Sequence, residues 1–255
     1  MKERLLGRLF LLLLVMLCTV VPVSGQQTPP SSPPPGPPPA LTPPPPLPPA
    51  MKPPQGGGGM ASPPPLRMVS PGVFEMDGCR IVKKQNRVEF PAEVNMDKGL
   101  LEYILVENAG KVHESLLRTR ISPYTLQIAL LLLGVEGSLH PLAEQGENRT
   151  PEGDRVKIWV SWQDKGKEKK VPVEQWIAKD GKAAGALPWV FTGSVVVDGV
   201  FLAQADKSMV ALFHDPSALI DHQLAEGASD EIWQVDSASV PPAGTAVTVI
   251  IEKNS

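Results

Sequence analysis

Cysteine is scarce in this sequence of 255 residues. Cys18 and Cys79 are the only two, and Cys18 lies in a segment that we expect to be removed. A mature chain with Cys79 alone cannot form an internal disulfide, and it cannot ligate an iron–sulfur cluster or a structural zinc ion through cysteines. We therefore expect no organic cofactor and no iron–sulfur cluster, and a bound metal ion stays open. Arg80 beside Cys79 favours a thiolate, but a catalytic thiol also needs a histidine partner, which the sequence does not place.

A strong net charge is missing as well. The formal net charge is -3, and the predicted signal segment contains Lys2, Arg4 and Arg8 against Glu3. Without them, 21 of the 24 basic and 26 of the 27 acidic residues remain, a net charge of -5. Such mild acidity predicts no nucleic-acid partner. The lysine-rich run at residues 165–170, KGKEKK, lies between two strand patterns and favours a solvated hairpin loop over an anion site.

The short motifs of common enzymes are also absent. The sequence has no zincin spacing, no Gly-x-Ser-x-Gly elbow and no Cys-x-x-Cys pair. Thr192-Gly193-Ser194 resembles the elbow only loosely and lies in a strand pattern, where a bulge is favoured. The glycines at residues 56–59 are followed by no Lys-Ser/Thr, so they are not a phosphate loop.

The N-terminus is typical of a secretory signal peptide. Basic residues precede an apolar run at residues 9–21, and the small residues Val23-Ser24-Gly25 follow, where a signal peptidase would cut. We predict a signal peptide at residues 1–25 and an extracytoplasmic location, which is periplasmic, cell-envelope or secreted. An uncleaved anchor or a lipid on Cys18 is the alternative, and only these would give the protein a membrane partner.

Residues 26–71 form a segment rich in proline and glycine. Nineteen of the 30 prolines lie between Pro29 and Pro65. Because proline fixes φ and lacks the backbone donor, we predict an extended, disordered linker that buries no core. It is either a stalk that holds a domain away from a surface or an unselective low-complexity tail.

Strand patterns dominate residues 72–255, which we predict to form one globular domain. Strands are expected at residues 81–82, 88–94, 101–106, 112–117, 155–163, 195–197, 200–203, 209–213, 232–235 and 245–252. We expect the strand at residues 101–106 to pair with the strand at residues 112–117. Asp198-Gly199 suits the turn of a tight hairpin.

One segment has a clear helix start and stop. Ser122-Pro123 provides an N-cap and a first helical proline, Gly134 provides the stop, and the residues from Ile128 to Leu133 are all apolar. We predict a buried core helix there and shorter helices at residues 173–179 and after Pro216. The expected fold class is α+β, a mainly antiparallel sheet packed against one buried helix with one or two further short helices.

Two histidine clusters are the candidates for chemistry. His214-Asp215 lies at the junction between a strand and the helix expected at Pro216, where backbone donors are free for a ligand. The alternative is a structural role for each of these residues. Asp215 would then be the N-cap of the helix expected at Pro216, His214 would be a core histidine, and His222, beside Asp221, would end that helix.

His113-Glu114-Ser115 is the second cluster, within the strand expected at residues 112–117. Neighbours in a strand point to opposite faces, so His113 and Glu114 do not easily serve one metal ion, whereas His113 and Ser115 share a face. The weak catalytic candidates are therefore His214, Asp215, His113, Glu114 and Ser115, and the weak metal candidates are His113, His214 and Asp215.

Several stretches resemble a known family. EFPAEVNMDKGLLEYILV (residues 89–106), GKVHESLL (110–117), WVFTGSVVVDGVFLAQ (189–204) and VALFHDPSALID (210–221) are similar to the YdjY-type domain, which occurs in exported bacterial proteins without an established activity. The resemblance covers roughly residues 72–253. It implies a bacterial, extracytoplasmic protein and marks His113, Glu114, Ser115, His214, Asp215 and Pro216 as motif positions. The ferredoxin-like label of some members is not supported by one mature cysteine.

Three hypotheses follow. The first is a non-enzymatic exported module that binds a protein or cell-envelope partner and is tethered by the proline-rich segment. The second is a metal-dependent or acid/base enzyme in which His214 and Asp215 meet His113 and Glu114. The third is glycan binding, which requires at least two exposed, coplanar side chains among Trp159, Trp162, Trp176, Trp189 and Trp233; core packing is the alternative for them.

Overall fold

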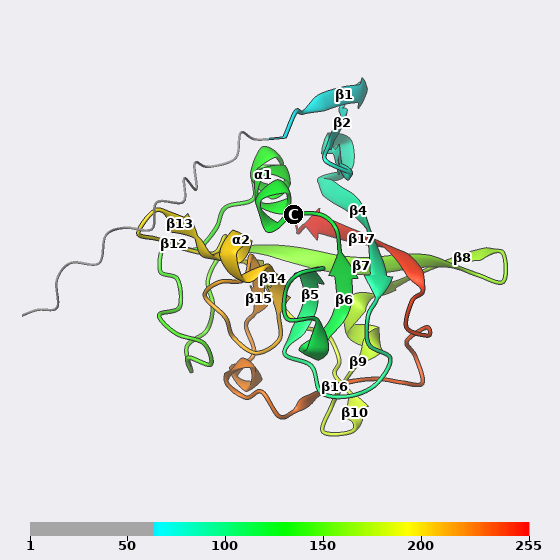
Figure 1. Cartoon of the computed structure of the whole chain (residues 1–255), viewed down its shortest axis with the longest axis vertical. Coiled ribbons are helices and arrows are strands. Elements are labelled where there is room, and N and C mark those ends of the chain that lie inside the picture. Colours follow the sequence, from blue (N-terminus) through cyan, green and yellow to red (C-terminus); the bar gives the residue numbers. More distant parts are fainter. Residues whose placement is uncertain (1–63, 255) are drawn as a thin grey trace, which may run out of the picture. The chain divides into compact units, whose positions relative to one another are not determined.

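The computed structural model describes residues 64–254 of the chain (Figure 1). The signal peptide predicted for residues 1–25 and most of the linker predicted for residues 26–71 lie outside the described residues. Within the described part, no helix is long and apolar enough to cross a membrane.

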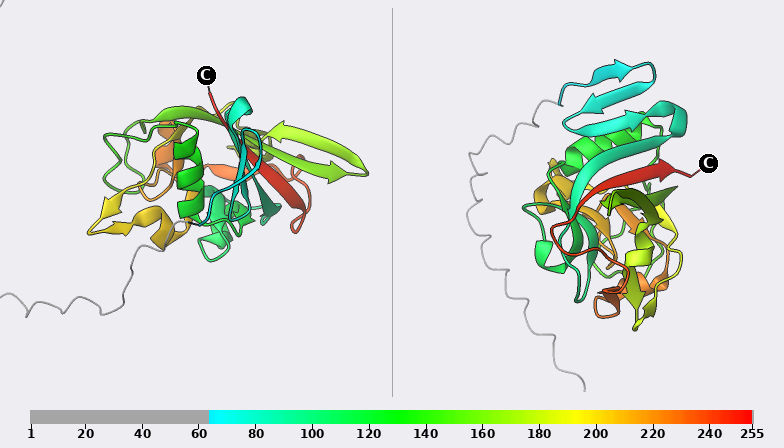
Figure 2. Two further views of the ribbon diagram at one scale, coloured as in Figure 1. Left: turned by 90° about the horizontal axis from the view of Figure 1, so that it is seen from above. Right: turned by 90° about the vertical axis from the view of Figure 1, so that its right-hand side faces the viewer.

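Eight strands close on themselves into a β-barrel (Figure 1, Figure 2). Around the barrel they follow the order β4 (Arg87–Val94), β17 (Ala246–Lys253), β7 (Asp154–Asp164), β11 (Trp189–Phe191), β15 (Ile220–His222), β14 (Ser208–Ala211), β5 (Tyr103–Glu107) and β6 (Ser115–Thr119), after which β6 pairs again with β4. The β14–β15 and β5–β6 pairs are parallel, and the other six are antiparallel.

The predicted α+β fold is therefore wrong, because the sheet closes instead of packing against a helix. The closing contacts pair Glu93 with Arg118, 25 residues further along the chain, and Val94 with Leu117. Local strand patterns carry no signal for such a pairing. Since the interior of an eight-stranded barrel is just wide enough to be filled by side chains, the barrel encloses its own core.

Alternation along the barrel strands directs apolar side chains inward. In β4, Val88, Phe90 and Val94 are buried and Pro91 is exposed. The long strand β7 covers the strand predicted at residues 155–163, and its Val156, Ile158 and Val160 are buried. This part of the sequence prediction is confirmed.

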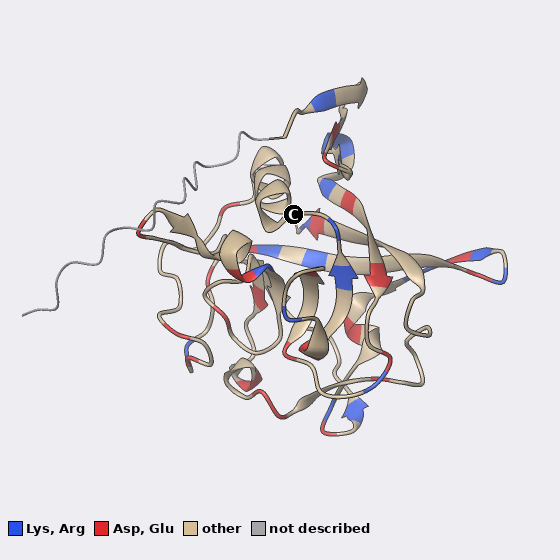
Figure 3. Cartoon of the chain, in the orientation of Figure 1, with Lys and Arg blue, Asp and Glu red and all other residues tan. Residues whose placement is uncertain are grey.

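Further strands extend or flank the barrel. The sheet continues from β4 through β3 (Cys79–Val82), β2 (Val73–Met76) and β1 (Arg67–Ser70), and β7 also pairs with β8 (Lys167–Pro172). A separate small sheet contains β10 (Lys182–Ala183), β9 (Ile177–Lys179) and β16 (Trp233–Val235). A two-stranded hairpin is formed by β12 (Val196–Val197) and β13 (Val200–Phe201). The run at residues 165–170 is mostly strand β8, and Figure 3 shows basic residues along the ribbon near the end of this hairpin. The hairpin at Asp198-Gly199 is confirmed.

Helix α1 (Pro123–Leu132) has the predicted cap but not the predicted central place. The Ser122 hydroxyl accepts a hydrogen bond from the Thr125 N–H at 3.1 Å. The helix packs beside β3, β4 and the short helix α2 (Leu202–Asp206), and its Leu131 is 50% exposed. It is thus a half-buried helix on the flank of the barrel.

Two other helix and strand predictions are wrong. No helix follows Pro216, because Asp215 makes a tight turn in which its carboxylate accepts the Ser217 N–H at 2.8 Å, and the chain then enters strand β15. His222 therefore lies in a strand. The segment predicted as a strand at residues 112–117 begins with the 3₁₀ turn η2 (Val112–Glu114), and it pairs with β5 in parallel.

Three further 3₁₀ turns complete the domain: η1 (Lys83–Gln85), η3 (Val173–Trp176) and η4 (Ala225–Ala228). The short helix predicted at residues 173–179 is the turn η3 followed by strand β9. Asn86 after η1 adopts the left-handed conformation, with φ of 48°, and completes the predicted hairpin between β3 and β4.

Candidate functional site

His214 is buried between β14 and β15, and both of its ring nitrogens face carbonyl oxygens. Nδ1 lies 3.2 Å from the Glu147 carbonyl, and Nε2 lies 3.1 Å from the His222 carbonyl. The side chain is 1% exposed. The backbone therefore occupies both ring nitrogens of His214.

Asp221 lies beside His214 and is held by two backbone groups. Its Oδ1 lies 3.7 Å from His214 Nε2, and its two oxygens accept the backbone N–H groups of His222 at 2.7 Å and of Asp215 at 3.2 Å. Complete burial raises the pKa of Asp221 to about 8. Asp221 therefore keeps its proton at a pH where a free aspartate would have lost it.

His222 is held as a neutral imidazole. Its Nε2 donates to the Leu212 carbonyl at 2.8 Å, and its Nδ1 accepts the Leu224 N–H at 3.2 Å. Trp189 and Trp233 pack against the ring, with centroids 5.8 and 5.3 Å away. Burial lowers the pKa of His222 to about 4. Both ring nitrogens are thus fully used by the fold.

These three side chains lie close enough together to suggest a metal site, since one ligand atom from each falls within 4.8 Å of the others. The hydrogen bonds do not fit such a site. A ligating imidazole must offer a free lone pair, but His222 Nδ1 already accepts a backbone donor and its Nε2 carries the proton. The remaining pair, His214 and Asp221, does not make a zinc site. The cluster is better explained as a buried contact between His214 and Asp221 beside a structural histidine.

Asp215 belongs to a second buried polar group. Its Oδ2 accepts the hydroxyl proton of Tyr103 at 2.7 Å, and that hydroxyl in turn accepts hydrogen bonds from Lys111 Nζ at 2.7 Å and Gln145 Nε2 at 3.1 Å. Burial and the nearby carboxylate of Asp215 raise the pKa of Tyr103. Tyr103 therefore stays protonated, and it orders Asp215.

His113 lies in a different environment from His214. Its side chain is 77% exposed, and its Nε2 lies 3.2 Å from the carboxylate of Glu114. The nitrogens of His214 are occupied by backbone groups, and no contact among the described residues joins the two histidines. Ser115 is buried and donates its hydroxyl to the Lys111 carbonyl at 2.6 Å. The structure therefore does not bring the two predicted clusters together.

The remaining sequence candidates have structural roles. Cys79 is buried, and burial raises the pKa of its thiol to about 12, which keeps it protonated. The Ser194 hydroxyl donates to the Ser217 carbonyl at 2.8 Å and is not free to act as a nucleophile. Three of the tryptophans are fully buried and the other two, Trp159 and Trp162, are half-buried. An exposed, coplanar pair for a glycan is therefore missing from the described residues.

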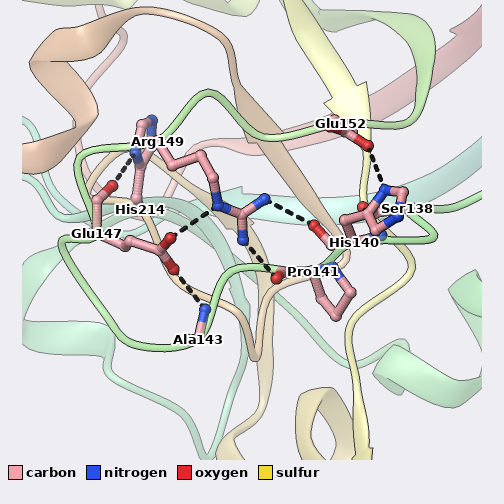
Figure 4. A network of polar contacts seen from close by, with 8 residues as sticks. All are labelled: Ser138, His140, Pro141, Ala143, Glu147, Arg149, Glu152 and His214. Atoms are coloured by element: carbon pink, nitrogen blue, oxygen red, sulfur yellow. Dashed lines mark hydrogen bonds and ion pairs between the residues drawn. The ribbon is translucent and has the colours of Figure 1, made fainter.

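A long loop at residues 137–152, which we call the lid loop, covers both polar groups. Arg149 holds its shape: it donates to Glu147 Oε1 at 2.7 Å and to the carbonyls of His140 and Pro141 at 2.9 and 2.6 Å (Figure 4). Loops of this length without secondary structure are commonly functional. The sequence contains no sign that Arg149 would do this.

The lid loop touches the polar groups directly. The Glu147 carbonyl faces His214 Nδ1, the Gly146 N–H donates to the His214 carbonyl at 2.8 Å, and Gln145 reaches the Tyr103 hydroxyl. The cavity between the loop and Asp215 is only about 10 Å³, so it holds no more than a water molecule. The closed loop therefore shuts these side chains off from any larger ligand.

An open groove lies beside the other side of the lid loop. It has a volume of about 570 Å³ and is lined by Gln127 and Leu131 of α1, by residues 136–139, and by residues 191–194 after β11. Leu131 is 50% and Leu139 is 89% exposed. The groove also contains Glu136 and Asp154, and the latter forms an ion pair with Lys253 at 3.1 Å. It is thus partly apolar and carries an excess of negative charge.

The floor of this groove needs two glycines. A Cβ on Gly137 would lie 2.7 Å from the Thr192 carbonyl oxygen, and one on Gly193 would touch the backbone of Gly137. The Gln127 side chain also lines the groove, but its oxygen is buried and is not accessible to a ligand.

Comparison with known proteins gives one match. A family model described as YdjY domain matches residues 80–252, a span that contains the barrel, both polar groups, the lid loop and the groove. No curated protein and no solved structure matches the chain.

Proposed function

We propose that this chain, which belongs to the YdjY domain family, is a non-enzymatic binding module that holds an apolar and basic peptide segment of a partner protein in the groove. The predicted signal peptide supports an extracytoplasmic location, and the proline-rich segment would tether the module. The observation that carries the proposal is the groove itself, with Leu131 and Leu139 exposed at its edge.

The size and chemistry of the groove decide the kind of partner. A volume of about 570 Å³ lies within the ordinary range for binding sites. Covering a fully exposed leucine contributes about 1.5 to 3 kcal/mol. Leu139 is close to that limit, whereas Leu131 is already half-buried and contributes about half as much. Asp154 is neutralised by Lys253, whereas no lysine or arginine among the described residues pairs with Glu136. Glu136 therefore favours a lysine or arginine among the apolar residues of the partner.

Exposed apolar surface continues next to the groove. The hairpin of β12 and β13 begins just after Ser194, and its Val196, Val197 and Val200 are each about half exposed or more. Exposed apolar patches of this kind commonly mark interaction sites. The buried polar groups contribute no such surface, because the closed lid loop covers them.

A peptide-display selection tests this proposal. The folded domain should enrich peptides that combine apolar residues with a lysine or arginine. Leu139→Asp and Leu131→Asp should each weaken binding of an enriched peptide about tenfold or more, since a loss of 1.4 kcal/mol is tenfold.

Leu100→Asp is the matched control for these variants, because Leu100 is also 50% exposed but does not line the groove. Its peptide affinity should equal that of the unchanged protein. Failure to enrich any peptide, or equal affinity of the enriched peptides for all three variants, would contradict the proposal.

A second candidate, an acid/base reaction, is favoured by one observation. The Tyr103 hydroxyl links Lys111 Nζ to the Asp215 carboxylate through two hydrogen bonds of 2.7 Å. A substrate would reach this relay only after the lid loop moves. Asp215→Asn would abolish such an activity, yet it should leave peptide binding in the groove unchanged.

A further inference from the structure

Exposed apolar side chains gather on two surfaces of the domain. Nine large ones are exposed among the described residues, and eight of these belong to one surface or the other. The first surface is the groove edge with the β12–β13 hairpin, which presents Leu131, Leu139, Val196, Val197 and Val200. The second is residues 66–69, which we call the β1 strip; its Leu66, Met68 and Val69 are 45 to 69% exposed. Exposed apolar patches commonly mark interaction sites.

β1 is the outermost strand of its sheet, so one of its edges has unpaired backbone groups (Figure 1). Among the described residues it pairs only with β2. Natural proteins often protect such edges with charged side chains. β8 has that protection, since its residues 167–170 are Lys-Glu-Lys-Lys. The β1 strip has Arg67 as its one charge, and its edge is therefore open to another strand.

The β12–β13 hairpin has a matching free edge. It is a two-stranded sheet of its own, so β12 has no second strand partner among the described residues. Phe201 of β13 packs edge-to-face against Tyr124 of α1, with ring centroids 6.4 Å apart, which attaches β13 to the domain. Ser194, which lines the groove, precedes β12 by two residues. A strand added to β12 therefore lies next to the groove.

The charges of the two surfaces have opposite signs. Arg67 is exposed on the β1 strip, and Glu75 lies opposite it on β2 without forming an ion pair among the described residues. The groove contains Glu136, with which no described lysine or arginine pairs, and the hairpin turn adds Asp198. The β1 strip is thus an apolar and basic segment of the kind that the groove is proposed to hold.

We infer that the partner of the groove is a second copy of this chain, whose β1 strip lies along β12 and the groove edge with its Arg67 at Glu136. This inference rests on the proposed function and names its partner. Because β1 is held by β2 in its own domain, the strip is presented to another copy. Different surfaces of the two copies meet, so the contact is heterologous and copies add head to tail.

Analytical ultracentrifugation of the purified protein at increasing concentration tests this inference. The unchanged protein should form dimers and larger species. Met68→Asp in the strip and Leu139→Asp in the groove should each weaken association about tenfold or more, because the contact would bury an unpaired carboxylate. Leu100→Asp is the matched control, since Leu100 is 50% exposed but lies on neither surface, and it should associate like the unchanged protein.

A mixture of two variants distinguishes a heterologous contact from a symmetric one. Met68→Asp keeps an intact groove, and Leu139→Asp keeps an intact strip. Neither should associate well alone, but the two together should form one-to-one heterodimers. Contact of β1 with β1 of another copy would leave the mixture monomeric, and that result would overturn the inference.

A charge exchange tests the placement of Arg67. Arg67→Glu and Glu136→Arg should each weaken association, and the double variant should regain most of it, because the opposite charges again face each other. A double variant that associates no better than the single variants would also overturn the inference.

The proposed function can stand or fall separately. An unchanged protein that stays monomeric at every concentration, while its groove binds selected peptides and loses them in Leu139→Asp, would overturn the second copy as partner and leave the proposed function intact. A monomeric protein that also enriches no peptide would contradict both.

Discussion

Replacement of Asp221 by asparagine should remove a loss of stability that the unchanged protein suffers between about pH 6.5 and pH 8. Burial raises the pKa of Asp221 from 3.8 to about 8 and lowers the pKa of His222 from 6.5 to about 4. The two side chains are neighbours in β15, yet their effects on the free energy of unfolding have opposite signs.

The sign of each effect on the free energy of unfolding depends on whether the folded or the unfolded chain binds the proton. Between pH 4 and pH 8 the folded state holds a proton at Asp221 that the unfolded chain has released, so stability falls as the pH rises. Between pH 4 and pH 6.5 the unfolded chain binds a proton at His222 that the folded state excludes, so stability falls as the pH falls.

The size of the stability loss depends on the pH range in which only Asp221 changes its protonation. Each bound proton contributes about 1.4 kcal/mol per pH unit, so the two effects cancel between pH 4 and pH 6.5. Above pH 6.5 only Asp221 acts, and the protein should lose about 2 kcal/mol by pH 8.

Urea denaturation followed by tryptophan fluorescence at several pH values measures this loss. Asp221→Asn should be less stable overall, because one backbone N–H loses its acceptor, but its stability should not change from pH 6.5 to pH 8. Asp164→Asn is the control, since Asp164 forms only an exposed ion pair with Lys169. A flat profile for the unchanged protein, or the same decline in Asp221→Asn, would refute the reasoning.

Three other predictions concern separate parts of the molecule. Gly227→Ala should destabilise the protein by about 1 to 3 kcal/mol in urea, because a Cβ would overlap the His214 ring, and a neutral result would show that η4 does not press on it. Arg149→Met should increase hydrogen exchange of residues 137–152 with little change in the melting temperature; unchanged exchange would mean that Arg149 does not hold the loop. Cys79 should resist iodoacetamide at pH 8 and react once urea unfolds the chain, and rapid labelling of the folded protein would contradict its burial.

Local features of the fold were predictable where neighbouring residues produce them. Ser122 caps α1, Asp198-Gly199 makes a hairpin turn, and the alternation in β7 gives a half-buried strand, because each depends on residues within a few positions. The helix predicted after Pro216 is wrong. The Asp215 carboxylate, which can cap a helix, accepts the Ser217 N–H in a single turn instead.

The candidate site was only partly predictable. His214 and Asp215 were recognised as unusual, but Tyr103 and Lys111, which surround Asp215, and Glu147, which faces His214, have no sequence signal. They are brought in from other strands and from the lid loop. Nothing in their local sequence distinguishes them from ordinary strand and loop residues.

The sequence by itself determined family membership, through stretches that resemble the YdjY-type domain. It also determined most strands and turns, because these depend on short-range periodicity. Only the tertiary structure decided that the sheet closes into a barrel and that His113 and His214 belong to separate environments. It also decided that His214 lies between Asp221 and a lid loop. The reason is physical: barrel closure and burial depend on contacts such as Glu93 with Arg118, far apart in the chain, and burial sets which side chains can bind a ligand or change charge.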